Sequence, residues 1–290
     1  MVSPKAKRQA TRHVQDAWHY SERQACRVVG TGRSSVRYEP RQRPDEAVLR
    51  RRIRELADKH KSYGYRFITA LLRREGFLVN KKRVHRIWQD EGLQQTRRRV
   101  TKRRYGPADE KLHKSERRNH VWSYDFIEDR TENGNKIRIL GVVDEFTRES
   151  LSIRAARSIP ATKVIDTLEW LFLVHGAPEH IRSDNGPEFI AHAVQNWLEQ
   201  RACNTIYITP GSPWENPYIE SFFATLRREC LDRHLFYSIS EAQTVLDAWR
   251  QEYNGYRPHS SLQYRTPADY ADLCATMPTA IALPAAAAAG

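Results

Sequence analysis

Three acidic residues in the second half of the chain suit metal-dependent chemistry. Asp125 lies within the apolar run 122–126, where a carboxylate is costly to bury unless it is paired or bound to a metal. Asp184 comes just before an Asn-Gly-Pro turn, and Glu220 lies in the second turn of a helix predicted to begin at Pro217. Three oxygen ligands from separate elements suit Mg²⁺ or Mn²⁺ rather than Zn²⁺. Two such ions about 4 Å apart can activate a hydroxyl and stabilise the leaving oxygen of a phosphodiester.

The alternative is that each of these acids is separately a helix cap, a turn residue or a surface charge. Other acidic residues are also candidates for metal ligands. Asp144 ends a predicted strand, and the Phe146-Thr147 pair beyond it favours a structural turn over a metal ligand. Glu188 and Glu215 flank the two segments that carry Asp184 and Glu220, and we expect them to cap helices or bond to loops.

A mixed sheet can bring the three acids together. Residues 120–127, 136–144 and 149–156 alternate as strands, with a hairpin turn at 132–135. Helices at 161–175 and 189–202 then alternate with short strands near Ile181 and at 205–208. Further helices are predicted at 217–231 and 240–253. The pattern predicts an α/β domain, a mixed five-stranded sheet with helices on both faces.

The first part of the chain is predicted to be helical and to bind DNA. Ser21 and Gln24 have capping-box spacing, and a glycine turn at 30–32 completes a helix-turn-helix outline. Asn80 and Gly92 bound a second candidate recognition helix, in which Val84, Ile87 and Trp88 form the packing face. The cations offered to a DNA groove and its phosphates are Lys81, Lys82, Arg83 and Arg86. The alternative is a solvated basic helix face.

The segment 96–104 is dominated by Arg and Lys, and we expect Arg98 and Arg103 to contact the DNA backbone without sequence preference. Together these patterns divide the chain into six parts: an N-terminal helix-turn-helix-like unit (1–40), a second helix-turn-helix DNA-binding domain (45–95), a basic linker (96–118), the catalytic core (119–235), a C-terminal helical extension (236–275) and a disordered tail (276–290).

Composition supports this division. The formal net charge of the 290 residues is +13, but residues 1–120 hold 33 Lys and Arg against 13 Asp and Glu, and the rest is acidic by seven charges. A strongly basic first part indicates a polyanionic partner, most commonly nucleic acid; a solvated surface without a partner is the alternative. No membrane span or signal peptide is expected, and four scattered cysteines without CxxC spacing fit a reducing cytoplasm.

Several segments agree in order with a known family. They are 121–126 (VWSYDF), 141–144 (GVVD), 181–189 (IRSDNGPEF), 210–216 (PGSPWEN), 220–222 (ESF) and 257–262 (RPHSSL). With these segments, residues 63–270 resemble the DDE transposases of two-frame bacterial insertion sequences, of the insertion-sequence-three type and the second reading frame. The 35 residues between Asp184 and Glu220 match the family's own spacing.

The resemblance implies a ribonuclease-H-like core, shared with retroviral integrases, and a triad of Asp125, Asp184 and Glu220 that binds two Mg²⁺, for which Mn²⁺ can substitute. It implies a DNA contact at Arg227, seven residues after Glu220 and so on the same helix face, where a surface ion pair is the alternative. Arg257 and His259 would also contact DNA, or His259 would hold the C-terminal segment against the core. The His/Cys zinc cluster of retroviral integrases is absent from the sequence, and residues 223–225 are more apolar than the family pattern.

The resulting hypothesis is a transposase that binds the terminal inverted repeats of its element and performs metal-dependent strand cleavage and strand transfer. Expected partners are double-stranded DNA, a second copy in a DNA-bound homodimer or larger assembly, and a first-frame protein of the same element. The expected location is the bacterial cytoplasm, associated with the nucleoid when DNA is bound. The alternatives are a non-catalytic DNA-binding repressor or relic, and a nuclease that cleaves without joining.

Overall fold

The computed structural model describes residues 3–38, 44–94, 114–183, 188–207 and 216–276, without the side chains of 188–191 and 207. The chain forms two compact units, Met1–Arg54 and Glu55–Gly290, and each is described by itself. No helix in the described ranges is both long and apolar enough to cross a membrane.

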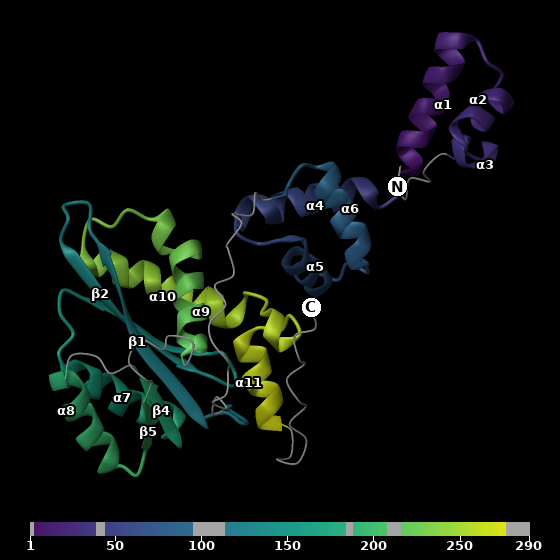
Figure 1. The fold of residues 1–290 in the computed structure, drawn as a ribbon. Helices are drawn as coiled ribbons and strands as arrows, with labels where there is room; N and C mark the ends of the chain where they lie inside the picture. Colours follow the sequence, from purple (N-terminus) through teal and green to yellow (C-terminus); the bar gives the residue numbers. More distant parts are fainter. Residues whose placement is uncertain (1–2, 39–43, 95–113, 184–187, 208–215, 277–290) are drawn as a thin grey trace. The chain divides into compact units, whose positions relative to one another are not determined.

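The first unit contains the short helices α1 (Pro4–Trp18), α2 (Glu22–Val29) and α3 (Arg33–Val36) (Figure 1). The predicted capping box is present, because Ser21 and Gln24 satisfy each other's backbone amides at the start of α2. Gly30 ends α2 with φ 62°, a left-handed conformation that glycine adopts without strain. Helix α4 (Glu46–Lys59) then runs from the first unit into the second.

The second unit continues with α5 (Tyr65–Arg74) and α6 (Lys81–Asp90). The Asn80 side chain accepts a hydrogen bond from the Lys82 amide, as the predicted N-cap requires. Val84, Ile87 and Trp88 are buried on one side of α6. The predicted packing face is therefore confirmed, and the polar residues between its members are left on the other sides of the helix.

A mixed sheet of five strands in the order β3-β2-β1-β4-β5 forms the centre of the core. Strands β1 (Val121–Arg130), β2 (Lys136–Asp144) and β3 (Ser150–Ala156) are antiparallel neighbours, whereas β4 (His180–Ser183) and β5 (Asn204–Tyr207) run parallel to β1. This is the α/β sheet that the sequence predicted.

Helices cover both faces of this sheet (Figure 1). One face packs with α7 (Ala161–His175) and α8 (Glu188–Glu199) around Trp122, Leu140 and Leu168. The other packs with α9 (Pro217–Glu229) and α10 (Ile239–Gly255) around Ile139, Phe222 and other apolar side chains. After α9 come two short 3₁₀ turns, Leu231–Arg233 and Ser260–Leu262, and a last helix, α11 (Pro267–Thr276).

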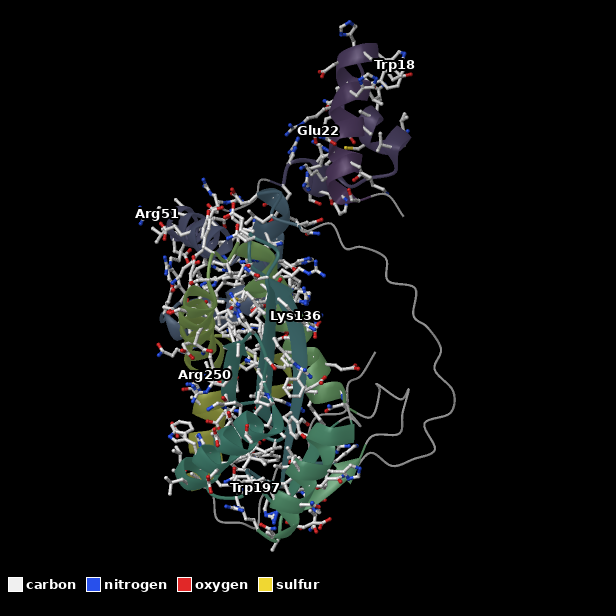
Figure 2. The ribbon with its side chains drawn as sticks, turned by 90° about the vertical axis from the view of Figure 1, so that its left-hand side faces the viewer. Trp18, Glu22, Arg51, Lys136, Trp197 and Arg250 are labelled. Atoms are coloured by element: carbon white, nitrogen blue, oxygen red, sulfur yellow. The ribbon has the colours of Figure 1, made fainter. Side chains whose placement is uncertain are left out.

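Helix α10 is also tied to the edge of the sheet by polar contacts. Arg250, labelled in Figure 2, donates from Nη1 to the carbonyl oxygens of Ser150 and Leu151 at 3.2 Å each. Asn254 accepts from the Ser150 amide at 2.9 Å and returns a hydrogen bond to its carbonyl. These bonds satisfy backbone groups at the start of β3, so α10 closes an edge that would otherwise be open.

Candidate active site

Asp125 points to the face of the sheet that α9 covers. Side chains alternate along a strand, and the neighbours Trp122 and Tyr124 belong to the cluster on the α7 face. Ile139 and Val143, which flank the cross-strand partner of Asp125, belong to the cluster on the α9 face. Asp125 is half-buried, and its Oδ1 accepts from the Phe126 amide at 2.7 Å.

A glycine allows α9 to lie directly against this part of the sheet. Gly141 pairs with Asp125 in the antiparallel register of β1 and β2. A Cβ atom on Gly141 would lie 2.7 Å from a ring carbon of Phe223, closer than side chains tolerate, and 3.2 Å from one of Phe222, which is a tight contact. Because Phe223 follows Glu220 by three residues on α9, the structure brings the helix that carries Glu220 onto the face to which Asp125 points.

Glu220 itself is exposed and lies in the first turn of α9 rather than in the predicted second turn, and partial desolvation raises the pKa of its carboxyl group. Seven residues later, Arg227 donates from Nη2 to the backbone carbonyl of Glu128 in β1 at 2.9 Å. This bond places Arg227 on the side of α9 that faces β1. The alternative to a DNA contact was a surface ion pair with a neighbouring acid, but the partner of Arg227 in this bond is a backbone carbonyl oxygen. The DNA contact at Arg227 stays a prediction.

Several predicted site residues lie outside the described part of the chain. They are Asp184, Arg98 and Arg103, together with Glu215. Strand β4 ends at Ser183, immediately before Asp184. Glu188 begins α8, but its side chain is not described.

Asp144 is a structural residue, as predicted. Its Oδ1 accepts from the amides of Phe146 and Thr147 at 2.9 and 2.8 Å, and its Oδ2 accepts from the Asn119 amide at 2.8 Å. The side chain is fully buried. A carboxylate that accepts three backbone amides stabilises a turn, and this one fixes the chain at the end of β2.

Sequence reasoning missed a buried charged group beside Asp125. Glu145 follows β2 and accepts at Oε1 both from Arg182 Nε, at 2.7 Å, and from the Ser123 hydroxyl. Burial raises the pKa of Glu145, whereas the Arg182 guanidinium and the Ser123 hydrogen bond oppose that shift. The sequence offered one signal for this pair, which was the presence of charged residues at the ends of strands predicted to be buried. Glu145 directly follows Asp144, and Arg182 precedes Asp184 by two residues.

The cations predicted to bind DNA fall into two groups. On α6, Lys81, Lys82 and Arg86 are exposed and Arg83 is half-buried. Arg86 lies 3.6 Å from Asp90 in an exposed i,i+4 ion pair. An exposed pair of this kind contributes little to stability, and the DNA contacts expected of this helix stay a prediction.

Arg257 and His259 are buried instead. Arg257 makes a two-pronged ion pair with Glu229, at 2.7 and 2.9 Å. The His259 ring lies edge-on to Tyr253, and burial lowers the pKa of His259 to about 3. These contacts favour the role of holding the C-terminal segment on the core, the alternative that the sequence left open for His259. For Arg257 the expected DNA contact stays untested, and the described side chain is occupied by Glu229.

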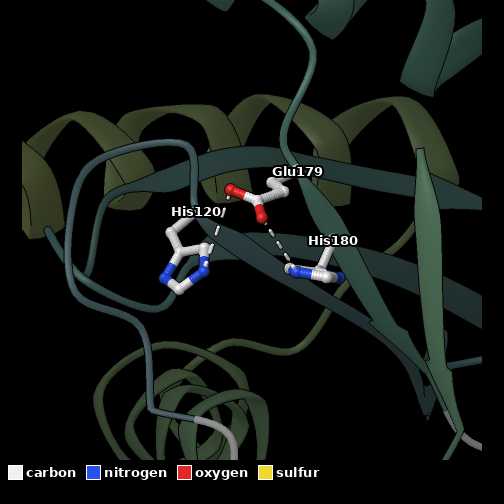
Figure 3. A group of neighbouring side chains, drawn as sticks. All are labelled: His120, Glu179 and His180. Carbon is white, nitrogen blue, oxygen red and sulfur yellow. Dashed lines mark ion pairs between the residues drawn. The ribbon is translucent and has the colours of Figure 1, made fainter. Parts of the chain in front are cut away.

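A second group of possible metal ligands lies at the other end of the β1–β4 pair (Figure 3). Glu179 lies between His120 and His180, 3.9 and 3.4 Å from their Nε2 atoms, and it also pairs with Arg117. The Glu116 amide donates to His120 Nδ1 at 3.0 Å. In neutral His120 the proton therefore lies on Nε2, which faces Glu179 as a donor and offers no lone pair to a metal. The group lies at the starts of β1 and β4, and its ion pair is the one between Arg117 and Glu179.

Comparisons with known proteins bear on the fold and the family of the chain. Residues 115–213 and 201–267 match two family models described as integrase core domain, and residues 43–101 match an HTH-like domain. An insertion element IS476 protein of Xanthomonas euvesicatoria, described as an uncharacterized 39.2 kDa protein, is 40% identical over 270 residues, which cover 93% of this chain and 78% of the relative. A putative transposase, InsK, for insertion sequence element IS150 of Escherichia coli K12 is 28% identical over 240 residues, with coverage of 79% and 84%.

Among solved structures, the intasome of simian T-cell lymphotropic virus in complex with the PP2A regulatory subunit B56 gamma contains a chain with the same fold. Its TM-score is 0.51 at 16% identity, and the alignment covers 82% of this chain and 79% of that one. The integrase-like fold and the close relatives that insertion elements encode lead to the same family. The chain belongs to the DDE transposases of insertion sequences, which carry an integrase catalytic core.

Proposed function

We propose that Asp125, Asp184 and Glu220 together form the acidic site at which this transposase cleaves and joins DNA strands. The observation that carries the proposal is the contact of Phe223 with Gly141, which places the helix of Glu220 over the cross-strand partner of Asp125. The parallel register adds support. It pairs Ser123 with Arg182, and the two proposed ligands follow these residues by two positions each in the sequence.

The donor set fits hard divalent cations, and we assign it two Mg²⁺ ions with Mn²⁺ as a substitute. Asp125 is half-buried on a rigid strand, and the raised pKa of Glu220 reflects a carboxylate that a positive charge would stabilise. When bound, the ions would supply Lewis acidity to the attacking hydroxyl and to the leaving oxygen. The carboxylates hold and orient this charge on the sheet, so the reacting strand meets a preorganised site.

Cleavage by water breaks one phosphodiester bond and leaves a 3′-hydroxyl. That hydroxyl then attacks a second phosphodiester, so one bond forms as another breaks and no external energy source is required. Neither step needs a covalent enzyme intermediate. The freed 3′-hydroxyl can join one element end to the other, which gives a circular intermediate, or can insert into target DNA.

Recognition of the element ends is assigned to the helical part before the core. Its α6 helix carries Lys81, Lys82, Arg83 and Arg86, and of these Lys82 and Arg86 lie opposite the buried apolar face, as in a helix that enters a DNA groove. Arg98 and Arg103 would add backbone contacts from the linker, and Arg227 would contact DNA close to Glu220.

The active form is proposed to be a DNA-bound homodimer or larger assembly, because two ends must react together. A first-frame protein of the same element is a further proposed partner. We place the protein in the bacterial cytoplasm, bound to the nucleoid when it engages DNA.

The experiment is strand cleavage and strand transfer with labelled DNA that carries an element end, in the presence of Mg²⁺. Asp125→Asn, Asp184→Asn and Glu220→Gln should each abolish both products and leave end binding intact. Cleavage without joined products would indicate a nuclease instead. If wild type binds ends but gives no product in Mg²⁺ or Mn²⁺, the protein is a repressor and the proposal fails.

A further inference from the structure

A buried charged group lies on the sheet beside Asp125 and has no part in the chemistry assigned so far. Glu145 is completely buried and Arg182 is 3% exposed. Arg182 Nε and the Ser123 hydroxyl both donate to Glu145 Oε1, while Glu145 Oε2 is buried without a hydrogen-bond partner among the described residues. We call Ser123, Glu145 and Arg182 the β1–β4 clamp.

The clamp joins three strands at one level of the sheet. Ser123 belongs to β1 and pairs with Arg182 of β4, and Glu145 directly follows β2. The Glu145 amide also donates to the carbonyl of Val121 in β1 at 3.0 Å. Because side chains two residues apart on a strand share a face, Ser123 lies on the same face as Asp125, one step away along β1.

Stability alone does not account for a group of this kind. Removing a carboxylate and a guanidinium from water costs more than an apolar pair of similar size would, and the unpaired Oε2 adds to that cost. A buried ion pair does, however, fix the distance and orientation of the elements that carry it, because any shift exposes an unpaired charge to a dry interior. The role of the clamp is therefore to be sought in the strands that it holds in place.

We propose that Arg182, held by Glu145, is a positioning residue that fixes the end of β4 against β1 and so sets the geometry of the carboxylates that bind divalent metal. The proposal rests on the acidic site proposed above. It assigns Arg182 and Glu145 no contact with DNA or with the reacting atoms. They act through the strands that present the ligands, as residues behind metal ligands commonly do.

The test replaces both charges at once, because removing only one would leave an uncompensated charge in the core. The double variant Glu145→Gln with Arg182→Met should fold with a melting temperature close to that of wild type. Mn²⁺ binding to the DNA-free protein, followed by electron paramagnetic resonance, should weaken about tenfold or more. Arg182→Lys keeps the positive charge but lacks the planar guanidinium fork. Its Mn²⁺ affinity should therefore lie between those of wild type and the double variant.

The control is an Arg–Glu pair on elements that carry none of the proposed ligands. Glu169→Gln with Arg201→Met removes an ion pair between α7 and the residues just after α8, and Mn²⁺ affinity should not change. Asp125→Asn should reduce Mn²⁺ binding in every background.

The outcomes separate the two proposals. If Asp125→Asn abolishes Mn²⁺ binding but the clamp variant binds like wild type, the positioning role is overturned and the acidic site stands. If Asp125→Asn leaves Mn²⁺ binding unchanged, the acidic site itself is overturned. Should the double variant fail to fold, Arg182→Lys decides the question: wild-type Mn²⁺ affinity in a folded Arg182→Lys protein overturns the proposal, and a weakened affinity supports it.

Discussion

At the scale of single residues, the site depends on a side chain that is missing. Gly141 has no Cβ, and Phe222 and Phe223 of α9 occupy the space where one would lie. The carboxylate of Asp125 is on the same face of the adjacent strand. The distance between sheet and helix, and with it the distance from Asp125 to the helix of Glu220, is therefore set by a glycine rather than by either acid.

Gly141→Ala should consequently disturb the site more than the addition of one methyl group suggests. The new Cβ must displace the Phe223 ring, which is buried, so we expect a loss of about 1–3 kcal/mol in the free energy of unfolding measured in urea. Strand cleavage should fall even at temperatures where the variant is folded. Gly255→Ala in α10 is the control, since nothing lies within 4 Å of a Cβ there, and the substitution should not lower the free energy of unfolding. Wild-type cleavage by Gly141→Ala would disprove the spacing argument.

His259 gives a second prediction at this scale, for stability as a function of pH. Burial, helped by the nearby charge of Arg257, lowers the pKa of His259 from 6.5 to about 3 in the folded state. Between pH 6.5 and about pH 3, His259 therefore binds a proton in the unfolded chain but not in the folded chain. The free energy of unfolding should fall as pH decreases below about 6.5, by at most about 1.4 kcal/mol per pH unit from this group.

The measurement is urea unfolding between pH 7 and pH 4.5, with His259→Gln as the comparison. The variant loses the His259 contribution, so its unfolding free energy should decline less steeply over this range, whatever its stability at pH 7. Equal slopes for the two proteins would show that His259 is not held neutral by the fold.

At the scale of elements, local patterns predicted most of what the structure contains. Capping residues marked the starts of α2 and α6, and apolar periodicity predicted the packing face of α6 and all five strands. Contacts between distant charges were not predictable. Glu145 meets Arg182 across 37 positions and Glu229 meets Arg257 across 28, and each pairing depends on strand register or helix packing that no local pattern encodes. Because the pairing of Arg257 with Glu229 could not be predicted, Arg257 was expected to contact DNA.

Helix α6 is the element on which end recognition can be tested. Lys81 and Lys82 are both exposed in its first turn. Replacing both by Ala should weaken binding to element-end DNA at 100 mM salt about tenfold, and should reduce the slope of log affinity against log salt by about two. Fluorescence anisotropy at four salt concentrations measures both quantities.

Lys163→Ala on α7 removes an equally exposed cation from the core and serves as the control, with no expected change in either quantity. An unchanged salt slope in the α6 variant would move the phosphate contacts to another element, such as the basic linker at 96–104.

At the scale of the whole molecule, charge is distributed unevenly along the chain. Residues 1–120 carry an excess of 20 positive charges, and the remaining residues an excess of seven negative ones. Without metal the negative charge of the proposed acidic site would repel the DNA that the basic part attracts, because DNA is itself a polyanion. Two divalent ions would reverse the sign of that local interaction.

This distribution of charge predicts that one variant has opposite effects on strand cleavage and on DNA binding. Asp125→Asn with Glu220→Gln should abolish strand cleavage in Mg²⁺. In EDTA the same protein should bind element-end DNA at least as tightly as wild type, since two charges that repel phosphate are gone while the basic part is intact. Adding Mg²⁺ should tighten wild-type binding more than it tightens binding by the variant, because only wild type gains metal charge at the site. Anisotropy in EDTA and in Mg²⁺ gives all four affinities from one experiment. If the variant binds more weakly than wild type in EDTA, the carboxylates contribute to DNA binding directly, and the division between a basic part that binds and an acidic core that cuts is wrong.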